Sequence, residues 1–320
     1  MVVGQLTASA TRLIGVRRRR RLSSAVAFWT FMAPLALGLL VFKYIAILWG
    51  LLLSFSNARG TVALGNWVGL ENYQTLLESP AFRAALVTIG LFTLFIVPTT
   101  FAISLGLALL VNRVPRGGAF FRTVFFVPGA VSYVTASLIW KTAIFNGLPS
   151  GLANALIGNF GAEPVFWIGT ARPPWFWLVL VTVRLWLQAG FYMIIFLAGL
   201  KEIPQELYEA AHVDGARTGL ATFRHITFPL LRNTSVAVLL LLLIAAFQAF
   251  DEFYNILGGG AQAQSGNNIL ARPPLVYLYA VAQGQQNYGL GSAGAFVLAL
   301  LIILVTLVQG RAFGFGRAAD

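Results

Sequence analysis

The chain has 320 residues, of which 58% are hydrophobic and only 10% are charged, whereas a soluble domain carries about 25% charged residues. This surplus of apolar side chains excludes a soluble globular protein and indicates an integral membrane protein, while the lack of cysteine excludes disulfides and thiolate sites. The net charge of +12 does not indicate a nucleic-acid partner, because the basic residues lie in loops between apolar segments, where membrane proteins carry them.

Six apolar segments are long enough to cross a membrane. A helix needs about 20 residues to span the hydrocarbon core, and lipid leaves no partner for unpaired backbone groups, so helices are expected. The alternation typical of a β-barrel is absent from these segments. The sequence therefore predicts an all-α, polytopic membrane protein with six transmembrane helices. They run over residues 26–54, 85–111, 119–144, 175–199, 234–257 and 290–310.

The first span is preceded by a basic tail, residues 1–25, which contains five consecutive arginines from Arg17 to Arg21. A secretory signal peptide also begins with positive charge, but its apolar part is only about 7–15 residues long. The segment 26–54 is longer, and no convincing small-residue cleavage site follows it. We therefore expect a retained anchor whose arginines hold the N-terminus in the cytoplasm and could contact anionic lipid.

The basic residues are divided unevenly between the two sides of the predicted bundle. Fifteen of the 22 lysines and arginines fall in the N-terminal tail, the second–third loop with Arg122 at the adjoining start of the third span, the fourth–fifth loop and the C-terminal tail, residues 311–320. The other three loops hold only Arg59, Arg83, Arg172 and Arg272. Because cytoplasmic loops carry the excess of positive charge, both termini are predicted to be cytoplasmic.

Two of the spans contain proline, which removes a helical hydrogen bond. Pro98 lies in the second span and Pro128-Gly129 in the third, so a kink is expected at each position. No internal repeat is evident, and inverted-repeat transporter folds therefore gain no support.

The predicted cytoplasmic segment 201–233 is polar and compatible with helix. Pro204 suits the first turn of a helix. Gly215 suits the end of that helix, because glycine accepts the left-handed conformation at little cost. A second helical stretch is expected to follow and to reach Pro229, where the chain must bend before the fifth span.

Small and acidic side chains occur together towards the end of the first of these two helices. Ala210 and Ala211 leave a small surface that another backbone can approach, and Glu209 and Asp214 offer acceptors to basic groups of a partner. These features suggest a docking surface. Composition alone equally allows a solvated helical hairpin that binds nothing.

The order of residues in this segment resembles the EAA loop of binding-protein-dependent ABC importer permeases. It departs from the family pattern only at Phe228, where leucine is usual. Further similarity extends over roughly residues 25–310 and is closest to the carbohydrate and glycerol-phosphate permeases. The matching loop residues are Glu209, Ala210, Ala211, Asp214, Gly215, Ala216, Phe223, Ile226 and Pro229. Those outside it are Arg122, Phe125–Pro128, Trp140-Lys141, Phe250-Asp251, Tyr254, Gly258–Gly260, Gly289 and Ser292-Ala293.

The resemblance implies a type I importer permease fold, with residues 26–310 as the transmembrane domain, in the bacterial cytoplasmic (inner) membrane. It implies that the loop residues named above form a coupling helix seated in a cytoplasmic ABC ATPase dimer. A second homologous permease would complete the pathway, and an extracytoplasmic binding protein would deliver the solute. The chain has no phosphate-binding glycine-rich motif, so it is expected to be no enzyme and to bind no cofactor, with ATP and Mg on the ATPase.

Apart from Arg122 at the inner start of the third span, five ionisable residues lie within or at the end of predicted spans: Lys43, Lys141, Arg184, Asp251 and Glu252. Each costs about 2.5–3.5 kcal/mol at a helix centre, so such residues usually face the bundle interior or water. With the predicted orientation all five lie in the outer half of the membrane. They could reach the outer headgroups or form structural ion pairs, for example Arg184 with Asp251. Alternatively, they could line the substrate pathway.

If the polar residues of the outer half do contact solute, aromatic side chains can contribute by stacking on sugar faces, although tyrosine and tryptophan also concentrate at membrane interfaces. The candidates for the substrate pathway are Trp140, Lys141, Arg184, Gln248, Asp251, Glu252 and Tyr254. The intramembrane cations keep a phosphate-bearing solute open beside a sugar.

Two other classes of function fit the sequence less well. A secondary transporter or channel needs ion-coupling acids at the bilayer midplane and no ATPase loop, whereas the acids here lie off the midplane. A membrane enzyme or metal protein finds little support, because His212 and His225 both fall in the polar loop without a metal-binding pattern.

Overall fold

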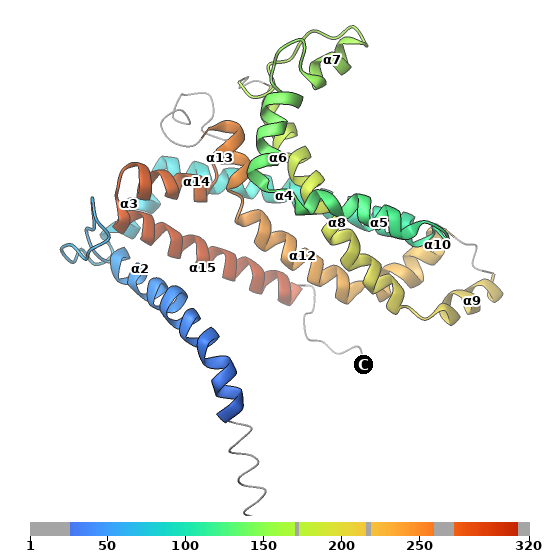
Figure 1. Ribbon diagram of the computed structural model, residues 1–320, viewed down its shortest axis with the longest axis horizontal. Coiled ribbons are helices and arrows are strands. Elements are labelled where there is room, and N and C mark those ends of the chain that lie inside the picture. The colour runs from blue at the N-terminus through green and yellow to red at the C-terminus, as the bar shows by residue number, and fades with distance from the viewer. Residues whose placement is uncertain (1–25, 170–172, 216–218, 259–271, 313–320) are drawn as a thin grey trace, which may run out of the picture.

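The computed structural model describes residues 26–169, 173–215, 219–258 and 272–312 (Figure 1). Within these ranges the chain is helical, and its only β-structure consists of isolated bridges between Ser56 and Trp67 and between Arg59 and Asn287. Five helices are long and apolar enough to cross a membrane, and a bent pair of helices makes a sixth span. The prediction of an all-α protein with several transmembrane helices is confirmed.

The spans begin and end within a few residues of the predicted positions. The continuous ones are Val26–Ser54, Pro80–Asn112 (α4), Phe176–Glu202 (α8) and Tyr288–Ala312 (α15). Two are interrupted: the third consists of Gly118–Ala130 and Tyr133–Ile144, and the fifth of Arg232–Phe247 (α12) and Asp251–Leu257 (α13).

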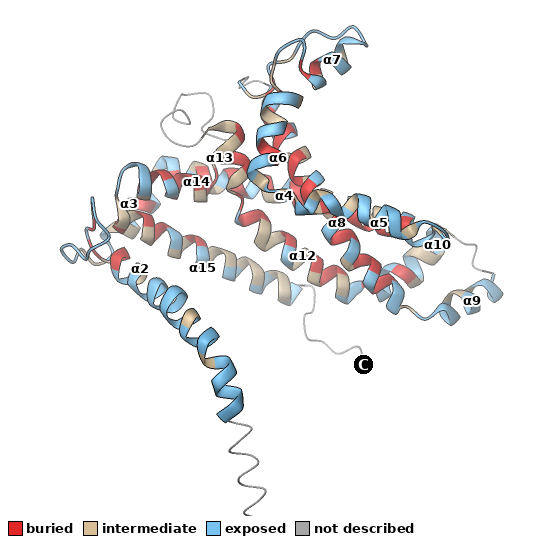
Figure 2. Ribbon diagram, viewed as in Figure 1, coloured by how far each residue is buried: buried red, intermediate tan, exposed pale blue. Residues whose placement is uncertain are grey.

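The centre of the bundle is formed by α4, α8 and α12, which pack against one another. Figure 2 shows that buried residues are frequent on these helices. The largest fully buried side chains include Phe82 and Phe92 of α4, Phe196 of α8 and Leu242 of α12. Close approach of α8 to α12 requires a glycine, since a Cβ on Gly199 would overlap the side chain of Thr234. Small residues at such contacts are typical of membrane helices.

Helix α4 starts and continues as its sequence suggests, apart from its proline. Pro80 occupies the first turn, and the Ser79 hydroxyl accepts a hydrogen bond from the Phe82 amide, which satisfies one free amide at the helix start. The helix then continues unbroken through Pro98 to Asn112. The proline lies on an exposed position, so the expected kink does not interrupt the span.

The third span is broken rather than kinked. If the chain is oriented as its basic residues predict, the inner part of this span is α5 (Gly118–Phe126), which packs along α8. A 3-10 turn follows at Val127–Ala130. The outer part, α6 (Tyr133–Ile139) and a π-helical turn at Trp140–Ile144, leaves at 93°. The α5–α8 contact brings backbone against backbone, because a Cβ on Gly190 would overlap the Phe125 carbonyl.

The fifth span is also interrupted, although no local sequence signal predicts the break. Helix α12 ends at Phe247 and α13 begins at Asp251, although no proline or glycine occurs between Arg232 and Leu257. The prediction of one helix over 234–257 is therefore corrected to two helices with a break at 248–250. A contact from outside the span stabilises this break, as described below.

The first span differs from the others in its exposure. None of its most apolar window is buried (Figure 2), and side chains such as Phe31 and Phe42 are more than four-fifths exposed. Only its outer end, α2 (Ala46–Ser54), packs against α15. The apolar surface of this helix therefore needs lipid or another protein to cover it.

Short helices connect the spans on the outer side, where α3 (Glu71–Glu78) and α14 (Pro274–Tyr279) lie beside the start of α15 (Figure 1). Helix α7 (Leu152–Gly158) stands away from the bundle, beyond the outer part of the third span. Its loop is ordered around one buried side chain, since Asn154 bonds to Leu148, Val165 and Trp167.

Candidate coupling helix and intramembrane polar cluster

The polar loop after α8 contains a short helix, α9 (Gln205–Val213), that projects from one end of the bundle (Figure 1). Ile203 and Pro204 are extended and separate α9 from α8, so Pro204 precedes the first helical turn instead of lying within it. The helix ends where the sequence predicts, because Gly215 has a φ of +83°. Glycine adopts this left-handed conformation without the strain of a side chain.

The tip of α9 is exposed. No residue of the helix is fully buried, and Glu209, Ala210, Asp214 and Gly215 are all exposed, with Ala211 half-buried. Val213 is 88% exposed, so no neighbouring residue covers its apolar side chain. The structure thus places five of the predicted coupling residues on one projecting surface, which we call the α9 tip. Ala216 lies outside the described residues.

The remaining predicted coupling residues lie on the second half of the loop, which returns to the bundle. This returning segment consists of α10 (Leu220–Thr222), a π-helical turn at Phe223–Thr227 and α11 (Phe228–Leu230). Phe223 packs against the hydrophobic core, and Ile226 is half-buried. Pro229 lies in α11, just before the chain turns into α12. Phe223 therefore anchors the loop to the bundle, whereas Pro229 is exposed and the α9 tip faces outward.

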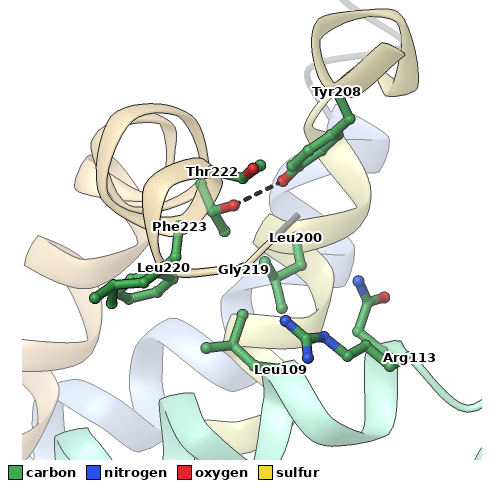
Figure 3. A pocket seen from close by; sticks show the side chains of 10 residues that line it. Leu109, Arg113, Leu200, Tyr208, Gly219, Leu220, Thr222 and Phe223 are labelled. Carbon is green, nitrogen blue, oxygen red and sulfur yellow. Dashed lines mark hydrogen bonds between the residues drawn. The ribbon is translucent and has the colours of Figure 1, made fainter. Parts of the chain in front are cut away.

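A cavity of about 570 Å³ separates α9 from the bundle (Figure 3). Leu109 and Arg113 of the inner end of α4 and Leu200 of α8 line one side, and Leu220 and Phe223 line another. The hydroxyl of Tyr208 on α9 forms a 3.1 Å hydrogen bond across this cavity with the hydroxyl of Thr227 on the returning segment. Helix α9 is thus held to the bundle by linkers and a polar contact, not by a packed apolar face.

A second polar cluster lies deep in the bundle, around Arg184 of α8. This side chain is buried and forms an ion pair with Glu252 of α13, with 2.5 Å between Nη1 and Oε1. Nη2 donates a hydrogen bond to the Ala245 carbonyl. The expected pairing with Asp251 is thus replaced by pairing with its neighbour, because successive helical residues point about 100° apart.

The tryptophan and lysine that follow α6 are also bound by protein groups. Trp140 Nε1 donates to the Thr182 hydroxyl at 3.1 Å, and its ring lies 5.1 Å from that of Trp186. Lys141 Nζ donates to the Asn255 carbonyl at 3.2 Å. Together with Arg184 and Glu252, four of the seven candidate pathway residues therefore make specific contacts within the protein. Lys43 of the first span is exposed.

The other three candidates lie at the break of the fifth span. Gln248 is exposed, and Asp251 and Tyr254 are half-buried. Tyr254 belongs to a group of three aromatic rings, since its ring stacks on Phe250 at 5.1 Å and meets Tyr279 of α14 at 5.4 Å. Sequence reasoning missed Tyr279, which no motif marks and which the fold brings to the break from a distant segment.

Comparisons with known proteins agree with this arrangement. The family model described as "Binding-protein-dependent transport system inner membrane component" matches residues 99–312, a range that contains both interrupted spans and α9. The arabinooligosaccharides transport system permease protein AraP of Bacillus subtilis is 31% identical, over 91% of this chain and 90% of its own. The multiple sugar-binding transport system permease protein MsmF of Streptococcus mutans is 33% identical, over 88% and 93%.

Among solved structures, a bacterial ABC transporter involved in the import of the acidic polysaccharide alginate contains a chain of the same fold. The TM-score is 0.81 at 22% identity, and the match covers 94% of this chain and all of the other. The same type of transporter, solved with an alginate pentasaccharide-bound periplasmic protein, gives a TM-score of 0.79 at 21% identity, with 91% and 95% of the two chains covered.

Proposed function

Because the chain belongs to the binding-protein-dependent transport system inner membrane components, we propose that it forms half of the pathway by which an ABC importer carries a sugar. The chain is a multi-pass protein of the inner membrane and a permease subunit of such an importer. The observation that carries the proposal is the α9 tip, which is an exposed surface of small and acidic residues projecting from the bundle.

The α9 tip is the surface that docks onto a cytoplasmic ABC ATPase dimer. Its two alanines allow close approach of another backbone, and the carboxylates of Glu209 and Asp214 offer acceptors to basic side chains. Val213 adds apolar surface that docking would cover. ATP and Mg bind to that ATPase, and this chain transmits the closure of the ATPase to its spans as a rigid-body change.

Two further partners complete the transporter. A second homologous permease covers the apolar surface of the first span, whose most apolar window is entirely unburied in this chain alone. An extracytoplasmic binding protein delivers the solute, in keeping with the family's dependence on such proteins. The binding protein docks on the face opposite α9. The excess of basic residues on the α9 side supports a cytoplasmic position for α9 and both termini.

A sugar fits the polar cluster better than glycerol phosphate does. A phosphate needs a cation in its path that is not neutralised by the protein, and Glu252 already neutralises Arg184. Lys141 keeps its charge but is held by the Asn255 carbonyl. Gln248, Asp251 and the aromatic group of Phe250, Tyr254 and Tyr279 offer hydrogen bonds and ring faces, which suit a sugar. Relatives named for arabinooligosaccharides and alpha-glucosides support the same class.

Uptake into proteoliposomes tests this proposal. The complete complex is reconstituted with its binding protein outside and ATP on the ATPase side, and the solute retained by the binding protein is identified by mass spectrometry. We expect a mono- or oligosaccharide whose uptake requires both ATP and the binding protein. A glycerol phosphate as solute would overturn the sugar assignment, and equal uptake without ATP would overturn the importer mechanism.

A further inference from the structure

Both interruptions in the spans lie beside the same buried residue, Arg184. Its guanidinium carbon lies 5.5 Å from the ring centroid of Tyr133, the first residue of α6, and 5.9 Å from that of Phe92 on α4. Its nitrogens bond to α12 and α13, one on each side of the fifth-span break. A single side chain of α8 thus contacts the residues that follow one break and flank the other.

The bond to α12 satisfies a carbonyl that the break leaves without its helical partner. In a continuous helix the amide of Ala249 would bond to the Ala245 carbonyl, but here it bonds to the Ala246 carbonyl instead. Nη2 of Arg184 donates to the Ala245 carbonyl in its place. A carbonyl without a hydrogen-bond partner is costly inside a membrane, so the bond from Arg184 to the half-buried Ala245 helps to stabilise a break in a segment without proline or glycine.

The bond to α13 neutralises both charges. Arg184 and Glu252 are 4% and 1% exposed, and either charge alone would be strongly unfavourable at this depth. A guanidinium suits the two tasks because its nitrogens form a planar fork that can donate in two directions at once. An ammonium group on lysine donates from one point and cannot reach both acceptors in the same way.

We call α6 with its π-helical turn, and α13, the outer limbs of the two interrupted spans. Two further contacts join these limbs to each other and to α8. Lys141 of the third span donates to the Asn255 carbonyl of α13, and Trp140 donates to Thr182 of α8. Helix α6 also packs directly against α13. The two limbs, α6 with its π-helical turn and α13, therefore share polar contacts both with one another and with α8.

We propose that Arg184 is a positioning residue that fastens the outer limbs of both interrupted spans to α8, so that the limbs move as one body during transport. The inference rests on the proposed function, which supplies the conformational change. The proposed role is to correlate the movement of α6 with that of α13. If Arg184 only stabilised the fold, the two helices would still move together in every variant that assembles.

The movements can be measured by electron paramagnetic resonance distances, because the chain contains no cysteine. One labelled pair, Val87→Cys with Leu138→Cys, follows α6 against α4, and a second, Val87→Cys with Leu257→Cys, follows α13 against α4. Val87 and Leu138 are exposed and Leu257 is half-buried. Each pair is measured in the complex with cysteine-free partner subunits, without nucleotide and after trapping with ATP and vanadate.

In the unmodified complex, we expect both distances to shift together on trapping. In Arg184→Gln, one distance should shift or broaden while the other keeps its nucleotide-free value. The matched control is Lys43→Gln, which removes an exposed cation of the first span and should leave the joint shift unchanged. If Arg184→Gln fails to assemble, Arg184→Met with Glu252→Leu removes both charges without stranding one, and the same loss of correlation is expected.

The inference would be overturned if both distances in Arg184→Gln shifted together, by the same amounts as in the unmodified complex. The same holds for the double variant where that is used. Either result would leave the importer function intact. A complex that binds ATP and vanadate but shows no shift of either pair in unmodified form would instead contradict the proposed function. Failure of the inference would thus be seen in the Arg184 variants, and failure of the proposed function in the unmodified complex.

Discussion

At the scale of single residues, the adjacent acids Asp251 and Glu252 have different surroundings and should differ in their roles. Glu252 is 1% exposed and paired with Arg184, whereas Asp251 is half-buried at the break. Glu252→Gln leaves a buried cation without its counter-charge, which costs about 3–5 kcal/mol. We expect a lower melting temperature and poor assembly. Thermal unfolding of the detergent-solubilised complex measures the effect.

Asp251→Asn should leave the melting temperature and assembly unchanged and should reduce sugar uptake, because the amide removes a charged acceptor from the break. The two variants make the same chemical change at neighbouring positions, so each is the control for the other. Normal uptake in Asp251→Asn would remove this residue from the solute pathway.

The α9 tip yields a second prediction for single residues. Glu209→Lys reverses the charge of an exposed acceptor, and Gly215→Val forces a branched residue into the left-handed conformation, which costs about 1–2 kcal/mol. Both should abolish co-purification of the ATPase while membrane insertion stays normal.

The controls separate charge and backbone effects from docking. Glu202→Lys makes the same charge change at the end of α8, outside the tip. Gly215→Asn substitutes a residue that tolerates the left-handed region, and no atom lies within 4 Å of a Cβ at this position. We expect ATPase recovery close to that of the unmodified chain in both controls. Full recovery in Glu209→Lys as well would eliminate the docking role of the tip.

At the scale of elements, the close contact between α5 and α8 depends on Gly190. A Cβ at this position would overlap the Phe125 carbonyl, whereas a Cβ on Gly106 of α4 would meet no atom within 4 Å. Gly190→Ala should therefore lower the melting temperature of the complex, and Gly106→Ala should not. Equal melting temperatures for the two variants would contradict the described packing of the third span.

The attachment of α9 to the bundle can be tested through Tyr208. Tyr208→Phe and Thr227→Val each remove the hydrogen bond across the cavity, which is worth about 1 kcal/mol. The ATPase should still bind, but fewer solute molecules should be carried per ATP, because the helix transmits movement less rigidly. The double variant should be no worse than either single one. Additive losses would show that the two side chains act separately.

The spans could be predicted from the sequence, but their breaks only in part. Six apolar stretches of sufficient length locate the spans, and Gly215 marks the end of α9 because its requirement is local. Pro128-Gly129 marks the third-span break, yet Pro98 lies in an unbroken helix. The fifth-span break has no local signal, since it depends on Arg184 from a helix more than 60 positions earlier.

The candidate sites differ in the same way. The α9 tip was predictable because its residues are contiguous and their resemblance to a known loop is direct. The polar cluster was predictable as a set of residues, but the partner of Arg184, the role of Trp140 and Lys141 and the contribution of Tyr279 depend on tertiary contacts. Depth in the membrane follows from counting residues, whereas the direction of a side chain requires the fold.

At the scale of the whole molecule, the exposed first span is the surface on which we propose that the second permease packs. Phe31 and Phe42 are 84% and 85% exposed, and α15 contacts only the outer end of the span. We expect cysteines at these two positions to cross-link to the second permease in the intact complex. The same cysteines in this chain expressed alone should react with a lipid-soluble maleimide. Absence of any cross-link would assign this surface to lipid.

The importer account requires that a signal crosses the bundle from the binding protein to the ATPase through α9. The most direct measurement is ATP hydrolysis in proteoliposomes that hold the complex, with sugar-loaded binding protein on the face opposite the ATPase. We predict that the loaded binding protein raises hydrolysis in the unmodified complex, and that a complex assembled by chemical cross-linking with Glu209→Lys shows no rise. A rise of equal size in that variant, or sugar uptake with the ATPase removed, would contradict the account.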